Sequence, residues 1–225
     1  PQQVKVGGVE PFVGNPGSGK TLTAKIIAST IKVPMIYVEA FGHSGLGQVF
    51  ERAAKIAPCI ILVEDLDTQI TDHTRSQFLN YMDGFLSSSG ILVIGTTNHP
   101  DHIDQALMNR PSRFDRKWIF PDPDEGYRVS YLIDRITKID DNIVISKSGI
   151  EKVAKSCKDY TFAMLQELVL TACWTWLDTD KKNPFIDALE SATKEMNEQL
   201  KLGDGMKAFK ELTKSRGQGV GFRAD

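Results

Sequence analysis

The chain has 225 residues and a mass of 25.0 kDa, with 27 Lys and Arg residues against 29 Asp and Glu residues. This length suits a medium domain plus a small one, and a formal net charge of -2 gives no general attraction for nucleic acid or an anionic membrane. The longest apolar runs, such as Cys59 to Val63, are far shorter than the roughly 18 residues that indicate a membrane span.

The first predicted element is a glycine-rich loop between a strand and a helix. Gly14 to Thr21 reads GNPGSGKT and fits the pattern G-x-x-x-x-G-K-[ST], with strand-like Phe12 and Val13 before it and helical spacing over Leu22 to Ala28 after it. The alternative is an ordinary Gly-Pro turn, but a turn has no need of a Lys-Thr pair at this offset. The pattern therefore predicts that backbone N–H groups and a helix N-terminus bind the phosphates of ATP or GTP. The residues expected to contact the nucleotide are Gly14, Asn15, Pro16, Gly17, Ser18, Gly19, Lys20, Thr21 and Leu22.

Further strands and helices alternate along the first half of the chain. Pro11 cannot donate to a strand ladder, so we expect the strand before the loop to follow it. The later predictions are strands at Met35 to Val38, Ile60 to Val63, Ile91 to Ile94 and Lys117 to Phe120, and helices at Gly45 to Ala54 and Arg75 to Phe85. This alternation predicts an α/β fold with a mostly parallel sheet and flanking helices, whose ligands collect at the carboxyl ends of the strands.

After Pro121-Asp122-Pro123 the pattern becomes helical. The predicted helices are Glu125 to Lys138, Ser148 to Cys157, Phe162 to Leu177 and Pro184 to Leu200. We therefore expect an α/β nucleotide-binding domain over residues 1–122, a small all-helical lid domain over 123–201 and a C-terminal tail over 202–225, with the hinge at Pro121 to Asp124.

The cysteines indicate a reducing compartment. Cys59, Cys157 and Cys173 are isolated, without metal-ligand spacing, and Pro1 to Lys5 lacks the apolar stretch of a secretion signal. A cytoplasmic location is the expectation, with the thiols packed as small hydrophobic groups.

Several motifs occur together and in order. After the phosphate loop come the apolar strand and acidic cluster of Ala57 to Asp67, the helix segment Gln77 to Gly84, the triplet Thr96-Thr97-Asn98 and the arginine-rich segment Arg110 to Arg116. Over roughly Phe12 to Ala172, this set resembles the AAA branch of the AAA+ ATPases. The phosphate loop, the acidic strand end, the triplet and the arginine-rich segment are similar to that family's Walker A, Walker B, sensor 1 and arginine-finger segments, and Gln77 to Gly84 is similar to the helix after Walker B. The resemblance implies a P-loop NTPase fold and Mg-dependent ATP hydrolysis.

Phosphoryl transfer to water requires charge neutralisation, a metal and an oriented nucleophile. By the resemblance, Lys20 holds the phosphates, while Thr21 and Glu64 hold Mg²⁺ or its water shell. Asp65 acts on the attacking water and Asn98 fixes the position of that water. The alternative for the two acids is a helix cap or a solvated turn, although adjacent acids closing a buried apolar strand are costly unless they meet a cation.

The order Glu64-Asp65 departs from the Asp-Glu order that the resemblance implies. A similar Glu-Asp order, together with Thr-Asn-His-Pro like residues 97–100, occurs in the AAA branch of the mitochondrial respiratory-complex assembly chaperones. Compared with the family, the longer side chain stands at position 64 and the shorter one at position 65. The sequence therefore does not predict how fast the chain hydrolyses ATP.

Arg110 and Arg113 match the arginines that, in the family, reach the ATP of a neighbouring subunit. The resemblance thus implies a homo-oligomeric ring, with a hexamer expected, acting on a protein substrate. Surface salt bridging is the alternative for these arginines and fits Arg116 better. Phe41-Gly42 is a candidate pore loop, although an ordinary core phenylalanine is at least as good an interpretation.

Three functions stay open. The first is a ring ATPase that remodels or translocates a protein, and the second is a slowly hydrolysing, ATP-dependent oligomeric scaffold. The third is a nucleic-acid-handling loader, which the net charge and the lack of a basic, aromatic-interleaved stripe disfavour. Since Pro1 to Gly8 is too short for the adenine-contacting segment of the family, the sequence can be a fragment of a longer protein.

Overall fold

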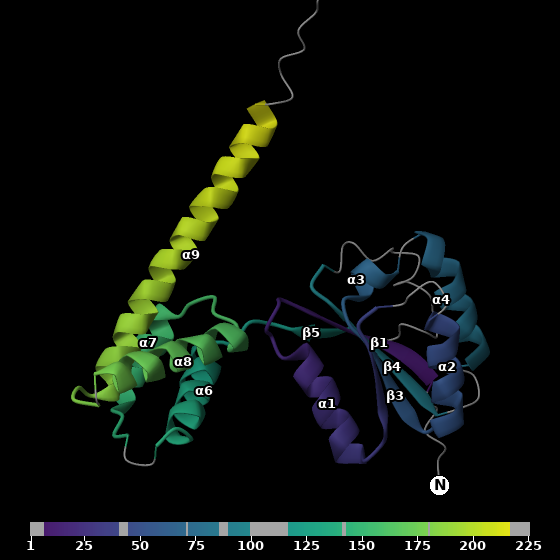
Figure 1. The fold of residues 1–225 in the computed structure, drawn as a ribbon, viewed down its shortest axis with the longest axis horizontal. Coiled ribbons are helices and arrows are strands. Elements are labelled where there is room, and N and C mark those ends of the chain that lie inside the picture. Colours follow the sequence, from purple (N-terminus) through teal and green to yellow (C-terminus); the bar gives the residue numbers. More distant parts are fainter. Residues whose placement is uncertain are drawn as a thin grey trace, which may run out of the picture. The chain divides into compact units, whose positions relative to one another are not determined.

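The computed structural model describes residues 7–40, 45–70, 72–85, 90–99, 117–140, 143–179 and 181–216. The chain divides into two compact units, Pro1–Asp122 and Pro123–Asp225 (Figure 1). The elements of the first unit are β1 (Gly7–Gly14), α1 (Lys20–Ile31), β2 (Met35–Val38), α2 (Gly45–Ile56), β3 (Cys59–Val63), α3 (Leu66–Gln69), α4 (Asp72–Phe85), β4 (Ile91–Thr97) and β5 (Trp118–Phe120).

The first unit is built on a parallel sheet with the strand order β2-β3-β4-β1-β5. Because every pair is parallel, the carboxyl ends of β1, β3 and β4 meet at one edge of the sheet. The prediction of a parallel α/β sheet with flanking helices, followed by a helical region, is confirmed.

The strand β3 is buried on both faces, as its continuous apolar sequence predicts. Alternate side chains point to opposite faces of a strand. Accordingly, Ile60 and Leu62 pack in one cluster with side chains of α1, and Ile61 and Val63 pack in another with side chains of α2. The two helices therefore cover opposite faces of the sheet (Figure 1).

The expectation that the first strand begins after Pro11 is wrong, because β1 runs from Gly7 and includes that proline. Pro11 is aligned with Gly95 of β4, whereas β5 pairs only with Phe12 to Gly14. Among the described residues, the strand thus has a neighbour on one side only at Pro11, so one missing N–H donor is tolerated in the way that edge positions tolerate proline.

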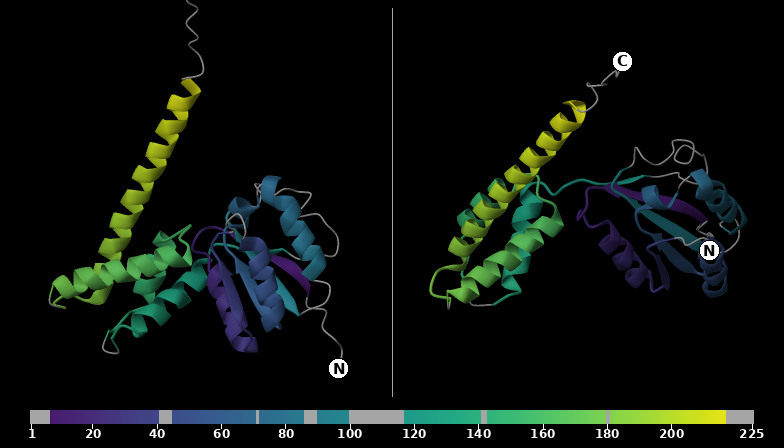
Figure 2. Two further views of the ribbon diagram at one scale, coloured as in Figure 1. Left: turned by 45° about the vertical axis from the view of Figure 1, so that its right-hand side comes forward. Right: turned by 45° about the horizontal axis from the view of Figure 1, so that its top comes forward.

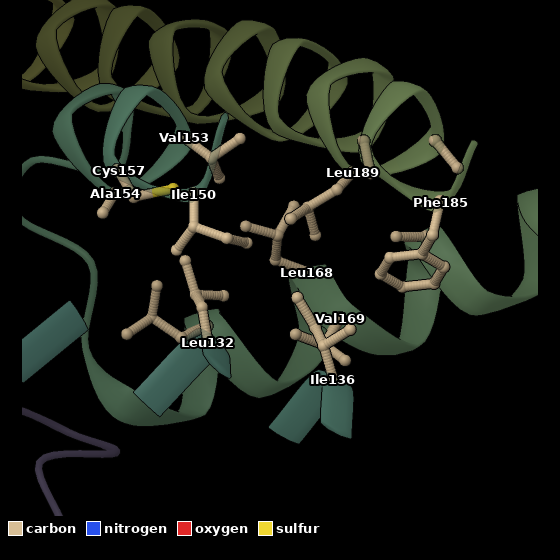
Figure 3. Packing of buried hydrophobic residues seen from close by; sticks show 14 of the residues in the cluster. Leu132, Ile136, Ile150, Val153, Ala154, Cys157, Leu168, Val169, Phe185 and Leu189 are labelled. Atoms are coloured by element: carbon tan, nitrogen blue, oxygen red, sulfur yellow. The ribbon is translucent and has the colours of Figure 1, made fainter. Parts of the chain in front are cut away.

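The second unit contains four helices over the residues that the structure describes. They are α6 (Glu125–Thr137), α7 (Lys147–Ser156), α8 (Phe162–Asp178) and α9 (Phe185–Arg216). Side chains cap three of them at the N-terminus, where Asp124, Ser146 and Thr161 each accept a hydrogen bond from a backbone N–H of the first turn. Buried side chains from all four helices meet in one core (Figure 3), including Leu132, Ile150, Leu168 and Leu189.

The prediction that the last helix ends at Leu200 is wrong. The helix α9 continues through Gly203 and Gly205 to Arg216 as one unbroken element (Figure 2). Glycine in a helix interior costs about 1 kcal/mol relative to alanine, which is small against a long run of good helix formers on either side. None of the described helices is both long and apolar enough to cross a membrane.

The buried thiol of Cys157 gives a pH-dependent prediction for the stability of the helical unit. Burial raises the pKa of Cys157 to about 11, whereas an exposed thiol titrates near 8.5. The folded state therefore keeps the proton longer than the unfolded state, and the stability from this group is complete below about pH 8.5 and is lost as the pH rises towards 11. We expect the free energy of unfolding, measured in urea, to fall over this pH range in the wild type and to fall less steeply in Cys157→Ala. Identical slopes would contradict the prediction.

Candidate functional site

Polar groups from three segments meet at the carboxyl edge of the sheet. The phosphate loop follows β1, Glu64 and Asp65 follow β3, and Asn98 follows β4. The neighbouring positions of β3, β4 and β1 in the sheet bring these segments together although they lie far apart in the sequence.

The loop requires glycine at particular positions. Gly17 and Gly19 have φ angles of 79° and 99°, in the left-handed region that side chains rarely adopt. At Gly14 a Cβ atom would lie 2.3 Å from the carbonyl oxygen of Phe120 in β5, so only glycine permits this close approach. The loop then passes into α1, whose first residue is Lys20, and the free N–H groups of that helix end suit an anion.

The Lys20 ammonium group is the centre of the site. Its Nζ donates to the carbonyl oxygens of Gly14 (2.7 Å) and Asn15 (2.9 Å) and to Oδ1 of Asn98 (2.8 Å). An ammonium group has three donors, so all three are used within the protein. Lys20 must release at least one of these oxygens in order to contact a phosphate.

Burial lowers the pKa of Lys20, while the carboxylates of Glu64, Asp65 and Asp67 oppose that effect. The side chain is only 7% exposed. The charge of Lys20 is thus poorly solvated and depends on nearby oxygen atoms, which favours binding of an anionic ligand at this edge.

Asn98 connects Lys20 to Asp65. Its amide oxygen accepts from Lys20, and its Nδ2 donates to Oδ1 of Asp65 at 3.3 Å. Sequence reasoning expected both Asn98 and Asp65 at this site, and the structure places them in contact. The direct bond between Asn98 and Lys20 was not foreseen, because nothing in the sequence shows which residues after β1 and β4 touch.

Glu64 is held by Thr96 and has one carboxylate oxygen without a donor. The Thr96 hydroxyl donates to Oε2 of Glu64 and accepts from the backbone N–H of Asp65 at 3.2 Å. Oε1 of Glu64 is closed to solvent and receives no hydrogen bond within the described part of the chain. A buried carboxylate oxygen of this kind suits a cation or its water shell, since hard oxygen ligands are those that Mg²⁺ prefers.

The donor set fits magnesium bound together with a nucleotide. Across the described ranges there is no group of three or more His, Cys, Asp or Glu side chains that could hold a metal by themselves. Mg²⁺ characteristically uses one or two protein ligands and takes the rest from phosphates and water. Glu64, which follows β3, and the Thr21 hydroxyl, in the first turn of α1, are the two side chains that could serve as these ligands.

The backbone gives a reason for aspartate at position 65. Asp65 has a φ angle of 47° and occupies the N-cap position of α3 without making a side-chain capping bond. Aspartate and asparagine are among the few side chains enriched in the left-handed region. The carboxylate is thus left free of the cap role that the sequence kept open as an alternative, and it is bound by Asn98 instead.

The remaining predicted residues divide into those that the structure describes and those that it does not. Leu22 lies on α1 with 58% of its surface exposed, and Ser18 has a buried hydroxyl with no partner among the described residues. Arg110, Arg113 and Phe41-Gly42 lie outside the described residues.

Sequence reasoning also missed the contact between Asn15 and Asp122. Nδ2 of Asn15 donates to Oδ2 of Asp122 at 2.7 Å, across 107 positions of the sequence. Thr96 belongs to the triplet that resembles sensor 1, but nothing in the sequence predicts its contact with Glu64. Asp122 carries only a weak signal, as a polar residue shortly after the apolar strand β5.

The chain is similar to several known proteins. The family model described as "ATPase family associated with various cellular activities (AAA)" matches residues 11–122. The chain is 35% identical over 217 residues to the ATP-dependent zinc metalloprotease FtsH of Aquifex aeolicus, covering 84% of this chain and 33% of that protein. It is 38% identical over 161 residues to the ATP-dependent zinc metalloprotease FtsH of Photobacterium profundum, covering 60% of this chain and 23% of that protein.

The chain thus spans no more than about a third of the length of these curated relatives. Among solved structures, the AAA domain of FIGL-1 in complex with ADP matches with a TM-score of 0.69 and 19% identity, covering 83% of this chain and 70% of that one. At this identity the match supports the fold.

The double hydrogen bond of Thr96 predicts a specific defect in metal binding. Thr96→Val keeps the shape of the side chain but removes the donor to Glu64 and the acceptor for Asp65. We expect the Mg²⁺ concentration needed for half-maximal nucleotide binding to rise several-fold, and the free energy of unfolding to fall by about 1 to 3 kcal/mol. Titration of a fluorescent ATP analogue at a series of Mg²⁺ concentrations measures the effect.

Thr97→Val is the matched control. Thr97 is also fully buried, but its hydroxyl donates to Asp67 and accepts from the backbone N–H of His99. It should lose similar stability without a change in Mg²⁺ requirement. Equal shifts in both variants would show that Thr96 acts only through stability.

Proposed function

We propose that this chain, which carries a domain of the AAA ATPase family over residues 11–122, uses its carboxyl-edge site to bind and hydrolyse ATP with Mg²⁺. The family assignment makes ATP the nucleotide and its hydrolysis the reaction. The observation that carries the role of the site is the hydrogen-bonded series Lys20, Asn98 and Asp65, together with the buried Glu64 oxygen that has no donor among the described residues.

Each residue has a task that follows from its position. Lys20 exchanges one of its internal oxygen acceptors for a phosphate oxygen and neutralises its charge. Glu64, oriented by Thr96, and Thr21 hold the metal shell, while the loop glycines allow close approach of the backbone. When bound, Mg²⁺ and the triphosphate supply the activated phosphoryl group.

Asp65 and Asn98 act on the attacking water. Asp65 presents an oxygen that accepts a proton, and the Asn98 amide can orient the same water because it already contacts that carboxylate. In this arrangement Asn98 also keeps Lys20 and Asp65 in a fixed relation.

We further propose that the ATPase works as a homo-oligomeric ring, with a hexamer as the expected form, that remodels or translocates a protein. The resemblance of Arg110 and Arg113 to arginine fingers supports this, as does the similarity to proteins named ATP-dependent metalloproteases. The Glu64-Asp65 order supports a likeness to the respiratory-complex assembly branch, and the free cysteines support a reducing, cytoplasmic setting. The slow scaffold is the second candidate, favoured by the same acid order.

The role of Asp65 predicts a loss of turnover without a loss of binding. Asp65→Asn keeps the size of the side chain and removes the proton acceptor, so we expect phosphate release to fall by about 10²-fold or more. Affinity for MgATP should stay close to that of the wild type. The control is Asp67→Asn, which alters a nearby acid that binds Thr97 and should keep most of its turnover. Unchanged turnover in Asp65→Asn would refute the role, and wild-type binding without hydrolysis would favour the scaffold.

The arginine role predicts complementation between two inactive variants. In a ring, the Arg113→Ala subunit lacks the arginine that reaches the ATP of the neighbouring subunit. The Asp65→Asn subunit lacks the acid that acts on the water in its own pocket. Each alone should be at least about 10²-fold slower than wild type, since an arginine finger contributes about 10³ to 10⁵ in rate.

Mixing the two variants should restore partial phosphate release, because some pockets then combine an intact Asp65 with a neighbour's Arg113. Arg116→Ala, for which we expect surface salt bridging, is the control and should be active alone. A mixture no faster than its components would refute an arginine supplied by a neighbouring subunit.

A further inference from the structure

The last residue of the first unit is bonded directly to the phosphate loop. Oδ2 of Asp122 accepts from Nδ2 of Asn15 at 2.7 Å. The other oxygen, Oδ1, is closed to solvent and receives no hydrogen bond from the part of the chain that the structure describes. Desolvation of this oxygen is unfavourable, so the bond to Asn15 is the compensating contact that the described residues provide for this carboxylate.

Asn15 joins this contact to the centre of the site. Its side chain binds Asp122, while its backbone carbonyl accepts from Nζ of Lys20 at 2.9 Å. The same residue therefore contacts Asp122 through its side chain and the Lys20 ammonium group through its backbone.

The segment that carries Asp122 is stiff. Pro121 and Pro123 flank it, so two φ angles are fixed by rings, and a residue that precedes proline is restricted to extended conformations. The backbone that carries this carboxylate therefore has few conformations available to it.

The first residue of the second unit is also anchored, within its own unit. The carbonyl oxygen of Pro123 accepts from Nη1 of Arg128 at 2.7 Å, and Nε of Arg128 donates to the carbonyl oxygen of Ala154 in α7 at 2.8 Å. Arg128 is only 7% exposed. Asp122 and Pro123 are thus adjacent residues with partners in different units: Asp122 is bonded to the phosphate loop, and Pro123 is bonded to the buried Arg128.

We propose that Asp122 is a positioning residue for the phosphate loop. By holding the Asn15 side chain, it keeps the Gly14 and Asn15 carbonyl oxygens in the arrangement from which Lys20 is released to the phosphates. This inference rests on the proposed function, since it assigns Asp122 to the same MgATP site. It makes nucleotide affinity depend on the residue at which the first unit ends.

The test is a double-mutant cycle on MgATP affinity in the full chain, with a fluorescent ATP analogue as the probe. Asn15→Ala and Asp122→Ala should each weaken binding by about 5- to 10-fold, which lies in the range of one typical intramolecular hydrogen bond. The double variant should bind MgATP as tightly as whichever single variant binds it less tightly, because the bond can be lost only once. Asp122→Asn keeps an oxygen acceptor and should bind within about twofold of wild type.

Two further readouts separate positioning from general destabilisation. Asp122→Ala should raise KM for MgATP with little change in kcat, because it alters the binding arrangement and leaves Asp65 untouched. Asp124→Ala is the matched control: it removes a nearby aspartate that caps α6, so it should lower stability without changing affinity.

The outcomes are distinct. If the wild type does not bind MgATP, the proposed function fails and this inference with it. If the wild type binds but the two single effects multiply in the double variant, or if Asp124→Ala weakens binding as much as Asp122→Ala, the positioning role alone is overturned.

Discussion

The site depends on the burial of one ammonium group among oxygen atoms at the carboxyl edge of a parallel sheet. Lys20 is nearly closed to solvent and is held by two carbonyl oxygens of its own loop and by Asn98. An isolated buried charge is very unfavourable, so the fold must keep these oxygens in place. The adjacency of β1 and β4 does so, because it sets Asn98 beside the loop.

The same constraint organises the acids. With β3 beside β4, Glu64 and Asp65 fall within reach of Thr96 and Asn98, and one set of short polar side chains orients both carboxylates. The polar groups gather where the strands end, while the central strand β3 is apolar and covered by helices on both faces. The apolar sheet thereby fixes the distances between the charged groups of Lys20, Glu64 and Asp65.

Much of this could be predicted from the sequence, for identifiable reasons. Strands such as Ile60 to Val63 have an apolar run that only a doubly covered strand explains, and the loop pattern specifies Lys20 and Thr21 by their offset. The contacts of Thr96 and Asp122 could not be predicted, since they depend on which strands are neighbours and on where a distant segment returns. The errors at Pro11 and after Leu200 have a common cause, because in both a local preference was outweighed. At Pro11 the described strands leave one side of β1 without a partner, and after Leu200 strong helix formers flank the two glycines.

The close approach of Phe120 to Gly14 has a consequence for the two strands that neighbour β1. Asn98, which touches Lys20, directly follows β4, and Phe120, whose carbonyl oxygen lies close to Gly14, belongs to β5. Since β1 lies between β4 and β5, the phosphate loop has contacts with both neighbouring strands. One of these contacts is made by a side-chain amide and the other by the backbone, so a shift of the loop requires an adjustment on each side of β1.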